Sequence, residues 1–383
     1  MKIPALILSV FISSSGMAQG TDMVYEKYDL TPDGKVLHSD IDLLPDGQTL
    51  AVSAAAWDGL QLVDASSMTV ISEHKVGKWN GGSRIDVSKD GSHILLQQNF
   101  YMDFSPNKDR EVSFEVISIE TGETVLKIAK AHDAQFHPDG NRLIVLEGDE
   151  VFSYPLNGSE KRTLFPVHEA SNCVAVSHDG KHIVISHHPD DGFVDDFVTK
   201  KRQKKNYKIY KKYRQCISVF DAENFERLYT VNDMFDIPYL LEFGPQDEYL
   251  LCYSVPHTKV VQKTGMKGTK YISKISRETG EVNQVGFVSN SYYEPDFEFS
   301  HSGDFIALVT VNITGHPEVW VANYHTGDVE ARYEMAQRIF GGHMKGELVP
   351  DAGRVGVAFS EDDSHLFLTY GSLIVKWKIP YKS

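Results

Sequence analysis

Residues 85–96 read IDVSKDGSHILL, and this pattern recurs along most of the chain. Alternating apolar residues predict a strand, the Asp-Gly pair predicts a tight reversal, and the apolar run that follows predicts a second, buried strand. The other copies, some of them weaker, are found at 40–52, 134–146, 174–186, 241–253, 297–309 and 357–370. The sequence therefore carries seven copies of one hairpin unit.

Each unit continues with a third apolar strand, a turn and a fourth strand, as in VSFEVISIETGETVLKI from Val112. Similar strand pairs begin at Cys216, Tyr271 and Glu318, and no convincing amphipathic helix interrupts them. Four antiparallel strands per unit, repeated in this way, are typical of a β-propeller blade. We therefore predict an all-β, seven-bladed propeller with four antiparallel strands in each blade.

The two ends of the repeat array complement each other. The last copy is followed by SLIVKWKIP from Ser372, which supplies a third strand but no fourth, whereas MVYEKYDL at 23–30 is a strand with no unit of its own. If this N-terminal strand completes the last blade, the ring closes and no sheet edge is left exposed there. An open sandwich or two smaller β domains are the alternatives. We expect residues 19–383 to form one propeller domain.

Two copies depart from the pattern at the turn. Copies five and seven carry Asp247 and Asp363 where most of the others carry Gly. Glycine adopts the left-handed backbone of such a turn without cost, and Asp tolerates it less well. These two turns are therefore expected to be the less favourable ones.

Turns of the FSxDG type, followed by a strand ending in VFD or VWV, resemble the WD40 repeat and the divergent bacterial WD40-like or YVTN-type propeller repeats. The resemblance covers residues 23–380 and implies a fold rather than a function. A Gly-His pair, which begins an authentic WD40 unit, stands ahead of a repeat copy at Gly342-His343, whereas the pair Gly315-His316 falls inside a unit. The Trp-Asp pair is best matched by Val219-Phe220-Asp221, since Trp57-Asp58 falls in a turn. The hydrogen-bonded Asp–His–Ser–Trp network of the family is therefore not expected in most blades.

Residues 1–18, MKIPALILSVFISSSGMA, have the pattern of a secretory signal peptide. One Lys precedes a short apolar run, and small residues stand before the predicted cleavage site after Ala18. The run is too short for a spanning helix, which needs roughly 20 residues, and no later segment reaches that length. We expect a periplasmic or secreted protein with no transmembrane segment after cleavage.

Composition excludes several classes of protein. With 53 Asp plus Glu against 38 Lys plus Arg, the net charge is −15, which disfavours sequence-independent nucleic-acid binding. Three Cys exclude a disulfide-built scaffold. Cys173 and Cys216 fall on strands of one unit with another strand between them, so we expect buried free thiols. No GxSxG, P-loop or CxxCH motif supports a serine hydrolase, an NTPase or a c-type cytochrome.

The unusually long connections all fall on one predicted face of the disc. We label the strands of a blade a to d from the axis outward, so that a–b turns share one face and b–c and d–a connections share the other. The excess length lies near 99–111, 187–215 and 256–270, between strands b and c, and at 336–354, between blades six and seven. Because binding usually resides in loops on a rigid scaffold, a one-sided distribution favours a binding surface, with neutral loop growth as the alternative.

The 187–215 insertion has the most unusual composition. Four acidic residues are followed by nine basic residues between Lys200 and Arg214, interleaved with tyrosines. One interpretation is a docking arm for an acidic partner, anionic lipid headgroups or a polyanionic polysaccharide; the other is a solvated segment whose two halves pair with each other. The candidate docking residues are Lys200, Lys201, Arg202, Lys204, Lys205, Tyr207, Tyr210, Lys211, Lys212 and Arg214.

Histidines and charged residues precede several predicted a strands, near the mouth of the central channel. Imidazoles and carboxylates that converge from several blades can bind a small ligand or a metal, or act as acid and base. They can equally cap strands at the channel rim, and no HxH or HExxH spacing identifies a metal site. The candidates for a ligand site are His38, Asp40, Arg84, His132, His168, Asp236, Glu294 and His343.

Two functions remain open from the sequence. The first is a non-enzymatic, exported and monomeric binding module that uses its loop-bearing face to bind a protein or a cell-envelope component, without nucleic acid or a cofactor. The second is a propeller enzyme resembling lactonases or lyases, with His, Glu and Arg at the channel mouth and, as one variant, a metal there. We favour the first because no catalytic motif is present and because fold alone does not specify function.

Overall fold

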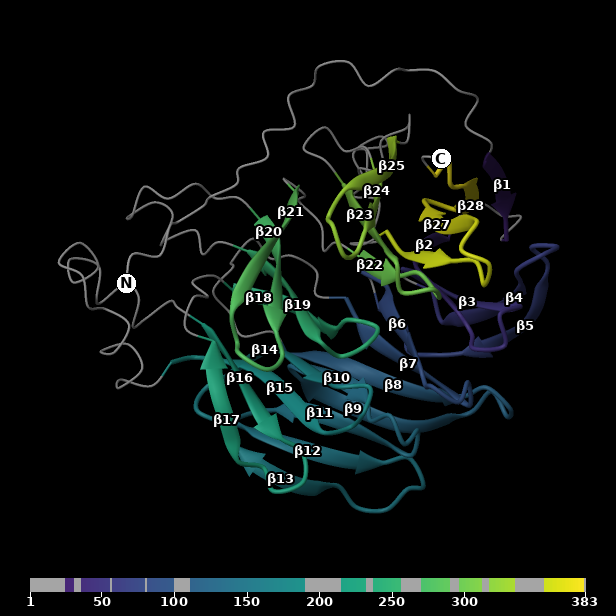
Figure 1. The fold of residues 1–383 in the computed structure, drawn as a ribbon. Helices are drawn as coiled ribbons and strands as arrows, with labels where there is room; N and C mark the ends of the chain where they lie inside the picture. The colour runs from purple at the N-terminus through teal and green to yellow at the C-terminus, as the bar shows by residue number, and fades with distance from the viewer. Residues whose placement is uncertain are drawn as a thin grey trace, which may run out of the picture.

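The computed structural model describes residues 25–30, 36–55, 57–79, 81–99, 111–189, 215–231, 237–255, 270–289, 296–311, 317–334 and 355–381. Within these ranges the chain forms seven four-stranded antiparallel sheets arranged in a ring (Figure 1). No helix occurs in the described ranges, so none there is long and apolar enough to span a membrane. The predicted fold class is confirmed.

The first three blades follow one another directly along the chain. Blade 1 contains β2 (Leu37–Leu43), β3 (Thr49–Ala55), β4 (Gly59–Asp64) and β5 (Val70–Lys75). Blade 2 contains β6 (Ser83–Val87), β7 (His93–Gln98), β8 (Val112–Ser118) and β9 (Thr124–Ala131). Blade 3 contains β10 (Asp133–Phe136), β11 (Arg142–Glu147), β12 (Glu150–Pro155) and β13 (Arg162–Pro166).

The next three blades repeat this order. Blade 4 contains β14 (Ala170–Val176), β15 (His182–His187), β16 (Cys216–Asp221) and β17 (Arg227–Val231). Blade 5 contains β18 (Ile237–Phe243), β19 (Tyr249–Val255), β20 (Lys270–Ser276) and β21 (Val282–Ser289). Blade 6 contains β22 (Asp296–Phe299), β23 (Phe305–Val311), β24 (Pro317–Asn323) and β25 (Val329–Glu334).

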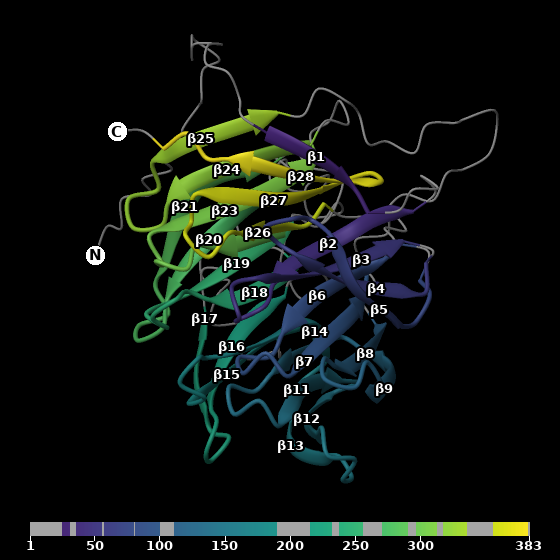
Figure 2. The same ribbon diagram turned by 90° about the vertical axis from the view of Figure 1, so that its right-hand side faces the viewer.

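Blade 7 joins the two ends of the chain, as predicted. Its first three strands are β26 (Val357–Phe359), β27 (His365–Tyr370) and β28 (Leu373–Lys378), and its fourth is the N-terminal β1 (Tyr25–Asp29). Tyr25 pairs with Trp377 and Asp29 pairs with Leu373 in an antiparallel register, and Figure 2 shows β1 in purple beside β28 in yellow. The ring is therefore closed by hydrogen bonds between strands from opposite ends of the sequence.

Apolar packing between blades forms the core. In the described residues there are seven buried apolar clusters, and each spans one seam between neighbouring blades. The clusters are built from the continuous apolar b strands and the alternating a and c strands, which is why the hairpin unit recurs with that pattern. Cys173, Cys216 and Cys252 are buried thiols, as expected for Cys173 and Cys216.

A Ser-x-Asp sequence closes the a–b turns of blades 2, 4 and 7 through its own side chains. In blade 2 the Ser88 hydroxyl donates to Asp90 at 2.7 Å and accepts from the backbone N–H of His93 at 2.9 Å. The same bonds recur at Ser177 in blade 4 and at Ser360 in blade 7. Side chains that bond nearby backbone groups favour turns over helix or strand, so this motif fixes the turn in the three blades that carry it.

Asp247 and Asp363 adopt the left-handed backbone that glycine adopts in the other blades, with φ of 60° and 55°. Both use their side chains to hold the a–b turn of the preceding blade. Asp247 accepts from the backbone N–H groups of His178 and Asp179, each at 2.9 Å, and lies 2.7 Å from His178 Nδ1. Asp363 accepts from the N–H groups of His301 at 2.8 Å and Ser302 at 2.9 Å. These hydrogen bonds compensate for the less favourable backbone.

Candidate functional site

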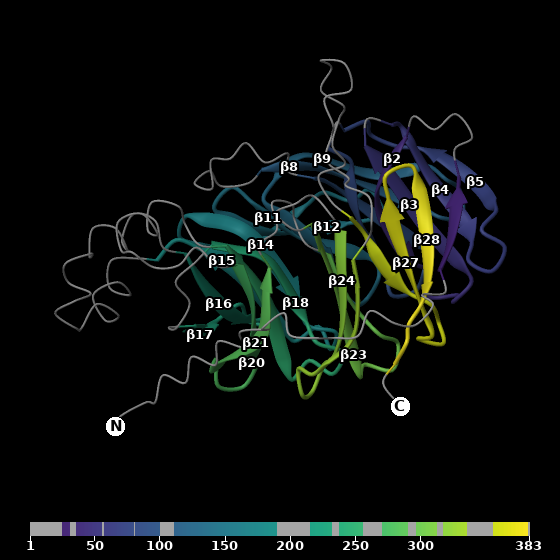
Figure 3. The ribbon, with the colours of Figure 1, turned by 90° about the horizontal axis from the view of Figure 1, so that it is seen from above.

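The two faces of the ring differ in their connections. All a–b and c–d turns lie on one face, which we call the turn face, and they are short and fully described. The b–c and d–a connections leave from the strand ends at the opposite face, which we call the loop face (Figure 3). The flanking strands confirm that the three long connections 99–111, 187–215 and 256–270 join strands b and c, and that 336–354 joins blade 6 to blade 7.

The candidate docking residues from Lys200 to Arg214 lie outside the described residues, but the strand ends that carry their segment are described. His187, the last residue of β15, is buried and lies 2.7 Å from the hydroxyl of Ser218 through Nε2 and 2.8 Å from the carbonyl oxygen of His188 through Nδ1. Ser218 in turn lies 2.7 Å from the hydroxyl of Thr230. Because a carbonyl only accepts, Nδ1 carries the proton and Nε2 accepts from Ser218. A hydrogen-bonded chain therefore crosses strands b, c and d at the base of the insertion.

A second buried network ties the same strand ends to strand a. The hydroxyl of Ser171 donates to Ser186 at 2.8 Å and reaches the side-chain oxygen of Gln215 at 3.2 Å. The amide of Asn172 donates to the carbonyl of Pro238 in blade 5 at 3.1 Å. Buried polar networks whose members are satisfied rigidify the structure around them. Both ends of the insertion therefore start from a fixed base on blade 4.

Carboxylates on the a strands link neighbouring blades around the channel. Asp40 accepts from the N–H of Ile85 at 2.7 Å, and Asp133 accepts from the N–H of Val174 at 2.9 Å. Asp296 does the same for Val357 at 2.9 Å. All three carboxylates stand four residues before the start of the a–b turn in their own blade. Asp40, proposed from the sequence as a ligand contact, thus satisfies a buried backbone donor of the next blade.

A second ring of links lies two residues further along the same strands. Gln135 of blade 3 accepts from the N–H of Val176 in blade 4 at 2.8 Å, and the Asp86 carboxylate of blade 2 accepts from the backbone of Phe136 in blade 3. Arg84 and the backbone N–H groups of Phe136 and Val87 favour the charged form of Asp86. Burial outweighs them and raises the pKa of Asp86 above its usual value. The side chains at this level therefore also hold blades together.

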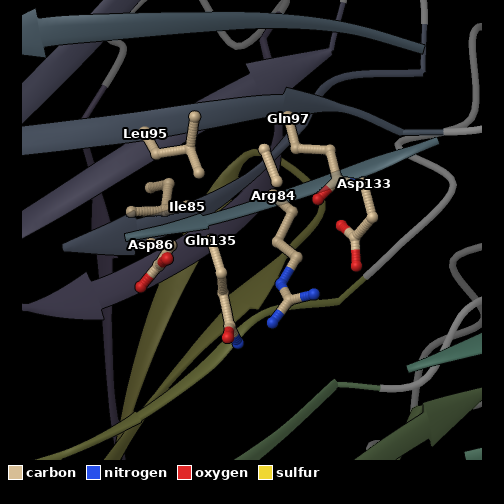
Figure 4. Close-up of a pocket in the computed structure, with 8 residues that line it drawn as sticks. Arg84, Ile85, Asp86, Leu95, Gln97, Asp133 and Gln135 are labelled. Carbon is tan, nitrogen blue, oxygen red and sulfur yellow. The ribbon is translucent and has the colours of Figure 1, made fainter. Parts of the chain in front are cut away.

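Arg84 lies among the carboxylates of several blades. Burial alone would lower the pKa of its guanidinium, but the carboxylates of Asp133, Glu242 and Asp86 more than offset this and raise the pKa above its ordinary value. Figure 4 shows Arg84 extending between Asp133 and Gln135. The pocket that these residues line encloses about 10 Å³, roughly the space of one water molecule.

Two channel carboxyl groups are destabilised in their charged form. Burial, and then the nearby Asp86 and Asp40, raise the pKa of Asp42 well above the usual range. Burial, and then Asp42 and Glu242, do the same for Glu298. These mutual effects join side chains from blades 1, 2, 5 and 6, which shows that they converge on the axis. Asp42, Asp86, Glu242 and Glu298 were not among the residues predicted from the sequence; their shared place two residues before a turn is the signal that identifies them.

Of the other predicted ligand residues, three belong to different blades of the described part of the chain and three lie outside it. His38 is buried where blade 1 meets blade 7, His132 is buried just before β10, and His168 is exposed in the connection before β14. Asp236, Glu294 and His343 lie outside the described residues. Within the described part of the chain no three His, Cys, Asp or Glu side chains are arranged to hold a metal ion.

Comparison with known proteins supports the fold and goes no further. No protein-family model matches the sequence, and no curated protein matches it either. Among solved structures, hydrazine synthase from Kuenenia stuttgartiensis aligns with a TM-score of 0.60 and 14% identity over 96% of this chain and 100% of that one. The β-propeller domain of Cps50 (Swd1) from Myceliophteria thermophila aligns with a TM-score of 0.60 and 10% identity over 93% and 100%. At such identities the likeness concerns the fold alone.

Proposed function

We propose that this divergent seven-bladed β-propeller is an exported binding module. Its loop face binds a protein or a cell-envelope component with an acidic surface. The observation that carries the proposal is the one-sided placement of the long connections. The turns of the other face are short, and their side chains are engaged in closing turns and joining blades. Function in such scaffolds usually resides in loops that a rigid framework positions.

The basic segment 200–214 is the part of the loop face best suited to an acidic partner. It holds nine of the 38 Lys and Arg residues in a chain of net charge −15, so it contrasts with the rest of the molecule. The hydrogen-bonded networks at His187 and Ser171 support a role as an oriented arm, since they hold both strand ends at its base. Electrostatic attraction of this kind accelerates association and weakens with salt.

The channel carboxylates are a less suitable centre for binding. Asp40, Asp133 and Asp296 accept hydrogen bonds from the backbone of neighbouring blades, and the pocket beside Arg84 is water-sized. Their arrangement supports a structural role for this ring of charges. The propeller enzyme considered from the sequence therefore stays a prediction, without an observation in the described residues that favours it.

The proposal is tested by neutralising the arm. In one variant six arm residues are replaced by Gln, namely Lys200, Lys201, Arg202, Lys211, Lys212 and Arg214. In the control three exposed turn-face lysines are replaced by Gln, namely Lys89, Lys181 and Lys378. Each protein is sedimented with the envelope fraction of the cells that produce it, at low and moderate salt. We expect salt-sensitive binding by the wild type and the control, and at least a tenfold loss in the arm variant. Equal binding by all three proteins would refute the assignment.

A further inference from the structure

His38 lies at the seam where the ring is closed. It is the second residue of β2 in blade 1, and its backbone N–H donates to the carbonyl of Gly371, in the β27–β28 turn of blade 7, at 2.8 Å. Its side chain is only 1% exposed. Leu30, the residue that follows β1, is buried and belongs to the apolar cluster of this same seam. The imidazole therefore sits inside the junction between the first and last blades.

The surroundings of the imidazole favour its neutral form. Neither ring nitrogen makes a hydrogen bond of ordinary geometry with a described residue. From β1 the facing charge is Asp29; the β27–β28 turn presents the backbone of Ser372, and β3 presents Ala54 as the paired residue. Along β2 the next charged group is Asp40, whose carboxylate accepts from Ile85. Burial outweighs the favourable effects of Asp29 and Ser372 and lowers the pKa of His38 to about 4.

This burial links protonation to the closed state of the seam. When the seam opens, the imidazole meets water and regains its ordinary pKa of about 6.5. A group whose pKa is lowered in the closed state stabilises that state above the ordinary pKa and loses this effect as pH falls toward the lowered value. With a closed-state pKa of about 4, the opening equilibrium rises about 20-fold between pH 7 and pH 5.

The strand that closes the ring is the element best placed to respond. β1 has five residues, four of them exposed, and it pairs with β28 alone. Every other blade in the described residues is built from consecutive stretches of the chain, whereas blade 7 borrows β1 from the other terminus. Local opening uses the elements with the fewest buried contacts. Because β1 is held by one strand pairing and its Asp29 faces His38, release of β1 is the opening of this seam that we consider.

We propose that His38 is an acid-sensitive latch on the closure of the propeller: the neutral imidazole keeps β1 in blade 7, and its protonation releases β1 and opens the seam between blades 1 and 7. The latch extends the proposed function, because opening this seam alters the loop face, where β2 begins one residue before His38. It does not depend on that function, since it is tested without a partner.

The test is hydrogen exchange of the full-length protein, followed by mass spectrometry at pH 7 and pH 5 and corrected for intrinsic exchange rates. In the wild type we expect the protection factors of β1 and of its partner β28 to fall about 20-fold, while those of β11 and β15 stay nearly constant. In His38→Gln this fall disappears. The matched control is His93→Gln, at a half-buried histidine of the blade 2 turn, and it keeps the wild-type response.

Three results would overturn the proposal. The first is an equal fall in the wild type and in His38→Gln, and the second is a fall spread over all blades. The third needs no variant: if NMR of ¹³C-labelled histidine shows the ring of His38 titrating near pH 6.5 in the intact protein, the imidazole is not held neutral. A ring that stays neutral down to about pH 5 supports the latch even if the Gln variant fails to fold.

Discussion

Replacing Asp247 with Gly tests how the blades are held together on the turn face. Five other blades carry Gly at this left-handed position, so the backbone of the turn accommodates the change. The substitution removes a carboxylate, 6% exposed, that binds two backbone N–H groups and the imidazole of His178. Hydrogen bonds to charged groups contribute about 1.5–3 kcal/mol each. Glycine also removes the cost of holding a non-glycine residue in the left-handed conformation, which offsets about 1 kcal/mol of the lost stability.

Counting the two bonds to backbone N–H groups and subtracting the relief, we expect Asp247→Gly to lower the free energy of unfolding by about 2–5 kcal/mol at pH 7. The assay is urea denaturation followed by circular dichroism. Asp363→Gly is the matched control, because its carboxylate also binds two backbone N–H groups but is more exposed, at 14%. Its loss should be smaller, about 1–2 kcal/mol. If Asp247→Gly is as stable as the wild type, or more stable, the left-handed aspartate is only a strained residue and the reasoning is wrong.

Two further predictions concern the seams and the channel. A Cβ added at Gly244 would lie 2.1 Å from Tyr324 Oη, so Gly244→Ala should cost about 1–3 kcal/mol in urea denaturation. Tyr324→Phe removes that oxygen, which has no hydrogen-bond partner among the described residues, and should restore most of the loss. At the channel, burial raises the pKa of Asp42, so folding stability falls as pH rises through that pKa. Asp42→Asn should therefore stabilise the protein at pH 8 and lose this advantage at pH 4, as thermal melting will show.

The repeat pattern sufficed to predict the ring. Local periodicity and turn chemistry define each hairpin, and the strand left over at residues 23–30 matched the strand missing from the last blade, as the pairing of Tyr25 with Trp377 confirms. These are local properties of the sequence, so they can be read without knowing which blades become neighbours. β1 is described over Tyr25–Asp29, which lies within the strand expected at 23–30.

Contacts between blades were not predictable in the same way. Asp247 was expected to be merely unfavourable in its turn, because nothing in the sequence shows that its carboxylate reaches His178, 69 residues earlier. Asp40 was considered a ligand contact, and the sequence likewise does not show that its carboxylate accepts from the N–H of Ile85 in the next blade. Aligning the seven units on their turns would have shown that acidic residues recur at fixed positions before the turn. That regularity indicates a structural role rather than one specific site.

The central claim is that the loop face binds and the turn face does not. Hydrogen exchange of the full-length protein, with and without the envelope fraction of the cells that produce it, tests this claim most directly. We expect added protection in peptides that cover the ends of β15 and β16 at the base of the basic arm. The a–b turns at 88–92 and 177–181 should exchange at unchanged rates. Protection of those turns with none at the ends of β15 and β16 would contradict the claim.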